Sequence, residues 1–579
     1  MRFSSTCTFL LLGLAVSPAS SQSGSGAAAQ TAAKAADLCS LDGRVLDAVT
    51  GEPLKKATVT LTLSNANPAP ATSLASLPQQ FSTSSDASGR FAMKDLDPGA
   101  YRLQASRAGF VTAEYGSRGP SKPGTPLTLV GGQQAKDLEV KLTPHGVIAG
   151  RVLDEDGAPA ASMMVQLLRP TYTGGKKQLT TAGSGQTNDL GEYRIFGLPP
   201  GRYYVTAGSL AAGLVGSIAV DRSAVPQPEE NYVATYYPGV TDPASATPVD
   251  VAPGAQIRGI DISLAKRRTV RVSGSVSAPA PVPLLILAPR SLAGALSMRM
   301  VRVDSQGKFE IRGVPPGAYT LSGSAQQNGK TLSSKLSIEV GQSHIEGLLF
   351  TVGPGVAVSG RVRVEGDATV DISKVKVRLQ PREIGLGTLL GAMGSLLSGG
   401  ELAGDSGKLD DHLGFRFDDV KSDLYDVSFT GLPDGYFIKS ERSGSADVLV
   451  SGLDVSNAAP EAVEIVLSPH GGQITGTVRT AGHQLAAQAT VALIPRDKER
   501  IGQTAYYHDA AVGQDGQFHF KSVPPGDYKL FAWEDVESGA WLDPDFMQPL
   551  DDRGYAITVH PDGHENAELM LFPAGASVK

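Results

Sequence analysis

The stretch GKFEIRGVPPGAY, Gly307–Tyr319, contains the signals that decide the fold of this chain. Its first glycine ends an Asp-x-x-Gly turn that starts at Asp304, and glycine takes there a positive φ that other residues resist. Phe309 and Ile311 then alternate with charged residues, which is the period of a half-buried strand. Pro-Pro-Gly makes the next turn, because proline presets φ and glycine closes the turn. The stretch therefore predicts a β-hairpin whose second strand begins at Tyr319.

Four further copies of this hairpin occur along the chain, and in each copy the tyrosine follows the first residue by 12 positions. They are GRFAMKDLDPGAY (Gly89–Tyr101), GEYRIFGLPPGRY (Gly191–Tyr203), LGFRFDDVKSDLY (Leu413–Tyr425) and GQFHFKSVPPGDY (Gly516–Tyr528). The fourth copy in chain order departs from the pattern, since Leu413 takes the place of the glycine and Lys421-Ser422-Asp423 replaces Pro-Pro-Gly. Five copies at one spacing indicate a tandem array.

A second landmark, Gly-x-Val at the start of a predicted strand, precedes each hairpin. The five glycines are Gly43, Gly150, Gly274, Gly360 and Gly476. Strands between the landmarks alternate apolar and polar residues, as in the run that contains Val59, Leu61 and Leu63. Half-buried antiparallel strands separated by frequent turns are typical of a β-sandwich.

Together, the two landmarks resemble the carboxypeptidase regulatory-like domain. That domain is a seven-stranded, transthyretin-like sandwich, related in shape to starch-binding-like domains and to the B-type repeats of collagen adhesins. The resemblance covers residues 39–579. In the peptidases that give the family its name, the domain lies beside the catalytic domain and does no chemistry. The resemblance therefore implies a non-catalytic module, and no peptidase domain is visible in the sequence.

We predict an all-β chain, a tandem array of five Ig-like or transthyretin-like antiparallel β-sandwiches. They are sandwich 1 (39–144), sandwich 2 (145–268), sandwich 3 (269–355), sandwich 4 (356–469, with a glycine-rich insertion at 383–409) and sandwich 5 (470–579). The composition agrees with this prediction. Hydrophobic residues are 41% of the chain, enough for several cores, and many of the 67 glycines and 38 prolines fall in the repeated turns.

The first residues predict the compartment. Arg2, an apolar run from Phe9 to Val16 and small residues after it form the pattern of a signal peptide, which we place at 1–22. A flexible linker follows at 23–38. Since Cys7 lies in the signal peptide, Cys39 is left alone and the mature chain has no intrachain disulfide. We expect a secreted bacterial protein, located in the periplasm, at the cell surface or outside the cell, with no transmembrane segment.

Charge and motifs argue against several function classes. The net charge is −7 and no long basic run occurs, so we predict no nucleic-acid partner. No G-x-S-x-G is present, and the His-Glu pair at 564–565 lacks the second histidine of a zinc-protease helix. His560 and His564 flank a Pro-Asp-Gly turn, which we interpret as a solvated turn in preference to a two-ligand metal site. We predict no catalytic residues, no metal and no cofactor.

One surface differs among the repeats. The outward positions of the tyrosine strand are polar in four copies, but in the fifth they are Lys529, Phe531 and Trp533. Trp541 follows closely, and these two tryptophans are the only ones in the chain. Flat aromatic side chains can stack on sugar rings or anchor a protein partner, so Phe531, Trp533 and Trp541 are the candidate ligand-binding residues. The preferred alternative is that residues 534–555, here called the excursion, fold over the sheet and bury these rings.

The leading functional hypothesis is a secreted, non-catalytic binding or scaffold protein. Its ligand would be extracellular or part of the envelope, with polysaccharide as the candidate and a protein partner as a further possibility. Two alternatives stay open, because a fold alone does not fix function. The chain could be a structural stalk or envelope spacer, or an accessory subunit of a peptidase or transport system.

Overall fold

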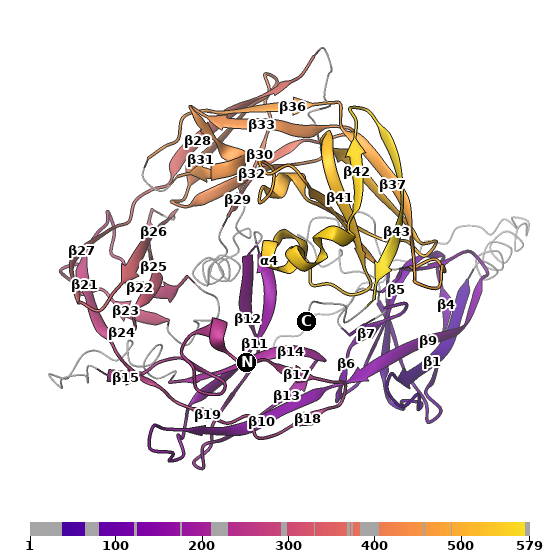
Figure 1. Cartoon of the computed structure of the whole chain (residues 1–579), viewed down its shortest axis with the longest axis horizontal. Coiled ribbons are helices and arrows are strands. Elements are labelled where there is room, and N and C mark those ends of the chain that lie inside the picture. Colours follow the sequence, from indigo (N-terminus) through magenta and orange to yellow (C-terminus); the bar gives the residue numbers. More distant parts are fainter. Residues whose placement is uncertain are drawn as a thin grey trace, which may run out of the picture. The chain divides into compact units, whose positions relative to one another are not determined.

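The computed structural model describes residues 38–63, 80–117, 119–120, 124–173, 176–209, 230–290, 298–328, 330–366, 371, 374–382, 405–455, 458–487 and 489–573. Regular structure in these residues is nearly all β-strand, and the few helices are short (Figure 1). The predicted all-β fold class is confirmed. The signal peptide, the linker up to residue 37 and the insertion from 383 to 404 lie outside the described residues. The chain forms two compact units, Met1–Pro144 and His145–Lys579.

The first unit contains one sandwich of two sheets. Its strands are β1 (Cys39–Asp47), β2 (Thr58–Leu63), β3 (Gln80–Ser84), β4 (Arg90–Leu96), β5 (Gly99–Ser106), β6 (Phe110–Val111), β7 (Ala113–Glu114), β8 (Leu127–Leu129) and β9 (Gln134–Pro144). One sheet has the order β4-β1-β9-β6, and the other has β3-β2-β5-β7 with β8 also on β5. The central strand β1 pairs antiparallel with β4 and parallel with β9.

The second unit repeats this plan, first in sandwich 2. Its elements are β10 (Gly146–Leu153), β11 (Met164–Thr173), β12 (Lys176–Gln186), β13 (Glu192–Leu198), β14 (Gly201–Gly208), β15 (Glu230–Tyr232), β16 (Thr235–Tyr236), η3 (Pro243–Ser245), β17 (Val249–Val251), β18 (Gln256–Ile257), β19 (Ile262–Ser263) and β20 (Lys266–Arg268). Sandwich 3 follows. Its strands are β21 (Val270–Ser277), β22 (Leu284–Pro289), β23 (Arg299–Arg302), β24 (Lys308–Val314), β25 (Gly317–Gln327), β26 (Lys330–Val340) and β27 (Ile345–Thr351).

Sandwich 4 has two sheets, β31-β28-β36-β33-β34 and β30-β29-β32-β35. Its elements are β28 (Val356–Val364), β29 (Lys376–Pro381), β30 (Asp405–Lys408), β31 (Gly414–Val420), β32 (Leu424–Thr430), β33 (Phe437–Ser443), β34 (Ala446–Asp447), α3 (Val448–Ser451), β35 (Leu453–Asp454) and β36 (Val463–Ser468).

Sandwich 5 differs because its strands join in one sheet, β39-β38-β41-β43-β37-β40, with β42 also on β41. Its elements are β37 (Gly472–Arg479), β38 (Thr490–Pro495), η5 (Thr504–Tyr506), β39 (His508–Ala511), β40 (Gln517–Val523), β41 (Gly526–Trp533), η6 (Ala540–Leu542), α4 (Pro544–Met547), η7 (Gln548–Arg553), β42 (Tyr555–Val559) and β43 (His564–Phe572).

Buried hydrophobic side chains gather in five main clusters. They span residues 39–142, 148–264, 270–352, 358–467 and 474–569. Each cluster lies within one of the sequence ranges predicted for a sandwich. The boundaries themselves stay a prediction.

The predicted β-hairpin is wrong in one respect, because the two strands of the repeated motif do not pair with each other. The strands β4 and β5, β13 and β14, β24 and β25, and β31 and β32 lie in different sheets, and β40 and β41 are not neighbours in their sheet. The turn between them carries the chain to a strand with other neighbours.

The tyrosine that follows this turn has one role in every copy. Its hydroxyl donates a hydrogen bond to the backbone carbonyl four residues earlier, across the turn that precedes its strand. The pairs are Tyr101–Asp97 (2.7 Å), Tyr203–Pro199 (2.6 Å), Tyr319–Pro315 (3.0 Å), Tyr425–Lys421 (3.0 Å) and Tyr528–Pro524 (2.8 Å). A buried tyrosine needs a partner for its hydroxyl, and the fixed turn supplies one. Lys421 shows that the bond survives without proline.

The Gly-x-Val glycine is required by close packing of strands. A Cβ atom at Gly43 would collide with the carbonyl oxygen of Leu138 on the parallel neighbour β9, and Gly274 meets Leu348 on β27 in the same way. At Gly476 the ring of Phe518 also closes the space. The glycine therefore allows the first strand, the last strand and the phenylalanine of the repeated motif to approach closely.

Candidate functional site

The three predicted ligand-binding residues lie together and are buried. Phe531 and Trp533 are on β41 and Trp541 is in η6, and the three side chains are 2%, 5% and 5% exposed. The ring of Trp533 stacks on Phe531 with centroids 5.6 Å apart, and on Trp541 with centroids 6.3 Å apart. Residues of the excursion complete this second core, together with Phe572 of β43. The rings therefore face one another, and ligand binding by them stays a prediction that would require the excursion to move.

A cavity lies beside this second core, where β41 changes its neighbour. Residues Gly526–Leu530 of β41 pair antiparallel with β42, whereas Ala532 and Trp533 pair in parallel with β43. Strand β38 pairs with the opposite edge of β41. Strands β42 and β43 therefore pair with successive parts of the same edge of β41 and separate from each other there. We call this place the fork. The fork holds a cavity of about 330 Å³ whose lining includes Arg553, Tyr555, Glu568, Met570 and Phe572.

The fork cavity combines apolar and charged side chains. Tyr555 is 43% exposed and Met570 is 52% exposed. The guanidinium of Arg553 lies over the ring of Phe572, 4.3 Å from its centroid. Glu568 is held by an ion pair with Arg479 of β37. The volume falls at the small end of ligand pockets, and the lining offers both hydrogen-bonding groups and an exposed aromatic ring.

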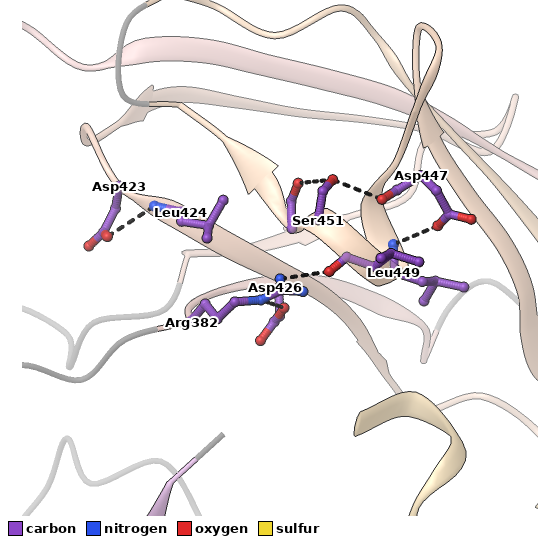
Figure 2. Close-up of polar contacts among 9 residues, drawn as sticks. Arg382, Asp423, Leu424, Asp426, Asp447, Leu449 and Ser451 are labelled. Carbon is purple, nitrogen blue, oxygen red and sulfur yellow. Dashed lines mark hydrogen bonds and ion pairs between the residues drawn. The ribbon is translucent and has the colours of Figure 1, made fainter. Parts of the chain in front are cut away.

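A second polar site lies in sandwich 4, at the corner where α3 packs against β32 (Figure 2). Arg382 follows β29, and its Nε donates to Asp426 Oδ1 at 2.7 Å while its Nη1 donates to the Val450 carbonyl at 3.0 Å. Asp447 caps α3 by accepting from the Leu449 amide at 3.1 Å. The guanidinium therefore ties the helical turn to β32.

Glu441 of β33 is buried at this corner, with 1% exposure. Burial and, to a smaller extent, the nearby carboxylates of Asp426 and Asp447 together raise its pKa to about 8. Within the described part of the chain, no hydrogen-bond partner occurs for its Oε1. Sequence patterns did not reveal this residue, because its inward direction follows from a register shift between Ile438 and Ser440 in the pairing with β36.

His508, at the start of β39, is a further titratable group and is half-buried. Burial lowers its pKa to about 4, and its Nε2 has no hydrogen-bond partner among the described residues. Of the two histidines that flank the Pro-Asp-Gly turn, His560 has its Nδ1 2.9 Å from Glu565. Nearby, His470 Nδ1 lies 2.8 Å from Asp562 of the same turn. In the described ranges, no group of three or more His, Cys, Asp or Glu side chains could hold a metal ion. Nor does any helix described there reach the length and apolarity needed to cross a membrane.

Two segments of the chain, residues 40–143 and 147–221, match the model of the carboxypeptidase regulatory-like domain. The family predicted from the repeated hairpin is therefore confirmed in these segments. No curated protein matches the sequence.

Several solved structures are similar in part. A minor pilin of Streptococcus agalactiae is 15% identical, covering 40% of this chain and 97% of its own, with a TM-score of 0.23. The major pilin subunit of Bacillus cereus is 10% identical over 55% of this chain and 99% of its own, with a TM-score of 0.14. A shaft pilin of Lactobacillus rhamnosus is 13% identical over 40% of this chain and 98% of its own, with a TM-score of 0.18.

Proposed function

We propose that this array, in which residues 40–143 and 147–221 are carboxypeptidase regulatory-like domains, is a secreted, non-catalytic scaffold protein that binds carbohydrate at the fork of sandwich 5. The signal-peptide pattern of residues 1–22 supports export. The tandem sandwiches support a scaffold. The fork cavity is the observation that supports a ligand, and it replaces the buried tryptophan rings as the place of binding.

The lining of the fork matches the chemistry of a neutral sugar. A pyranose ring has apolar C–H faces and hydroxyl groups at its rim. The exposed ring of Tyr555 can stack on the apolar face, and Glu568 and Arg553 provide planar groups that accept from and donate to hydroxyls. One anion and one cation leave the cavity without a strong charge of either sign, which favours a neutral sugar over an acidic one.

The fork is also held in place before any ligand arrives. Strand β41 aligns β42 and β43 on its edge, and the ion pair with Arg479 fixes the Glu568 carboxylate. A pre-positioned polar group loses less conformational entropy when it binds a ligand.

Glycan-array binding of the full mature chain tests this function. We expect binding to neutral glycans that falls at least about tenfold in Tyr555→Ala and in Glu568→Gln, the loss of roughly 1.4 kcal/mol or more. Phe196→Ala is the control, because Phe196 is an exposed aromatic residue of sandwich 2, 71% exposed. Glycan binding that is equal in all three variants would contradict the fork as the site. A stable protein partner without any glycan signal would instead favour the accessory-subunit hypothesis.

A further inference from the structure

Glu441 is the buried titratable residue of sandwich 4 that ligand binding does not use. It lies on β33 directly opposite Ile465 of β36, a residue of the core. Its side chain is 1% exposed. A carboxyl group in such a place is stable in its neutral form, because an isolated buried charge is very costly.

The charged groups that face Glu441 are mainly anions. Asp426 approaches from β32 and Asp447 from β34, and both raise the pKa of Glu441. The cation of this corner, Arg382, is already hydrogen-bonded to Asp426 and to the Val450 carbonyl. Helix α3, with the sequence VLVS, brings no titratable side chain. An ionised Glu441 would therefore meet two carboxylates, and no donor to its Oε1 occurs in the described structure.

The elements β34 and α3 at this corner are short. Strand β34 has 2 residues and α3 has 4. They are secured by the Asp447 cap, by the Ser451 hydroxyl, which donates to the Asp447 carbonyl at 2.8 Å, and by Arg382 (Figure 2). Within α3, the side chain of Val448 is buried, with 2% exposure. By contrast, β32 and β36 are bonded along their length to neighbouring strands.

We propose that β34 and α3 form a pH-sensitive latch, which stays closed over neutral Glu441 and opens when this carboxyl group ionises. Opening of residues 446–451 lets water reach the carboxylate and moves Asp447 away from it. It breaks few hydrogen bonds, since these elements are short, and it uncovers the apolar side chain of Val448. This inference goes beyond the proposed carbohydrate binding, because the latch lies in sandwich 4 and the fork in sandwich 5.

The direction of the effect follows from the pKa. The folded-state value of about 8 exceeds the ordinary value of 4.5, so raising the pH increasingly favours any state in which Glu441 is hydrated. The opening equilibrium should rise up to tenfold for each pH unit until the closed-state carboxyl group itself ionises. Strands of the same sandwich that do not cover Glu441 should not show this local opening.

Hydrogen exchange of the full chain at pH 6, 7, 8 and 9 tests the latch, with exchange times scaled to the intrinsic rate at each pH. We expect the protection of peptides within 440–455 to fall about tenfold or more over this range. Peptides from β25 and β26 of sandwich 3 serve as the internal reference. In Glu441→Gln, which cannot ionise, protection at 440–455 should stay constant with pH.

A second variant keeps the test decisive if Glu441→Gln does not fold. Asp447→Asn retains a capping side chain and removes one of the two facing carboxylates, so the pH-dependent loss of protection should become smaller. Constant protection of 440–455 in the unmodified chain would overturn the latch. An equal loss of protection in Glu441→Gln would overturn it as well. Neither outcome bears on glycan binding by the fork.

Discussion

Sandwiches 4 and 5 contain the same tyrosine motif, but the segment that follows the tyrosine strand takes a different route in each. Tyr425 and Tyr528 make the same hydroxyl bond to a carbonyl four residues earlier. After β32, the chain of sandwich 4 joins the sheet that contains β28 and β36, through β33 and β34. After β41, the chain of sandwich 5 packs as the excursion on the outward side of its own strand.

The two routes of the chain bury different kinds of side chain. The route taken in sandwich 4 brings a carboxyl group, Glu441, between the sheets. The route taken in sandwich 5 covers Phe531 and Trp533 and leaves a cavity at the fork. The repeated motif therefore makes the same tyrosine-bonded turn in both, whereas the segment after it determines which side chains are buried there.

Glu441→Gln should have the largest effect on this comparison, through the stability of sandwich 4. Because the folded-state pKa of about 8 is above the ordinary 4.5, stability is full below pH 4.5 and is lost as the pH rises through 8. The loss is about 1.4 kcal/mol per pH unit, on the order of 5 kcal/mol in total. The variant should lack this dependence. The slowest-exchanging amides of β28 and β36 measure it, and an unchanged pH slope would refute the assignment.

Trp533→Ala should remove a large part of the second core of sandwich 5. Replacing a buried aromatic residue by alanine costs about 3–5 kcal/mol. Both tryptophans of the chain lie in sandwich 5, so the fluorescence of the remaining Trp541 reports the unfolding of this sandwich in urea. Phe196→Ala, an exposed site, is the control. An unchanged urea concentration at the unfolding midpoint would mean that packing of the excursion does not stabilise sandwich 5.

His508 should give sandwich 5 the pH dependence opposite to that of sandwich 4. Its folded-state pKa of about 4 is below the ordinary 6.5, so its stability contribution is present above pH 6.5. It is lost as the pH falls through 4, by about 3 kcal/mol in total. Tryptophan fluorescence in urea at pH 7 and pH 4.5 measures this loss. His508→Gln should flatten the profile, and a profile that is equally steep in the variant would assign the effect to other groups.

The smallest expected effect concerns the shared tyrosine motif. Tyr528→Phe and Tyr425→Phe each remove one hydroxyl donor, with an expected cost of about 1 kcal/mol. Because each hydroxyl donates to the carbonyl four residues earlier, at 2.8 Å in Tyr528 and 3.0 Å in Tyr425, the two losses should agree within about half a kcal/mol. A much larger loss at Tyr528 would show that the Pro-Pro-Gly turn, absent in sandwich 4, depends on the hydroxyl more strongly. Hydrogen exchange of β41 and β32 allows both to be measured in one chain.

The repeated motif and its strands could be predicted from the sequence because the patterns that specify them are local. The spacing from Gly307 to Tyr319, the positive φ at Gly307 and the alternation of Phe309 and Ile311 depend only on the backbone and on neighbouring residues. The same holds for Leu413, which occupies the glycine position and takes φ 60°. Such features are readable without knowing the partner strand.

The candidate sites could not be predicted from the sequence because they depend on contacts with strands that are distant along the chain. Glu441 faces inward only because its strand shifts register against β36. Tyr555 and Glu568 come together only because β42 and β43 share one edge of β41. Likewise, whether Trp533 meets solvent depends on where the excursion packs.

The sequence by itself determined the repeated turn-and-strand motif, the all-β class and, for residues 40–143 and 147–221, the regulatory-like family, since turns and period-two strands are properties of short stretches. Only the tertiary structure decided that the tryptophans are core residues, that Glu441 is buried, and that a cavity lies at the fork. Burial and pKa depend on every atom within several ångströms, and those atoms are contributed by residues up to about a hundred positions away in the sequence.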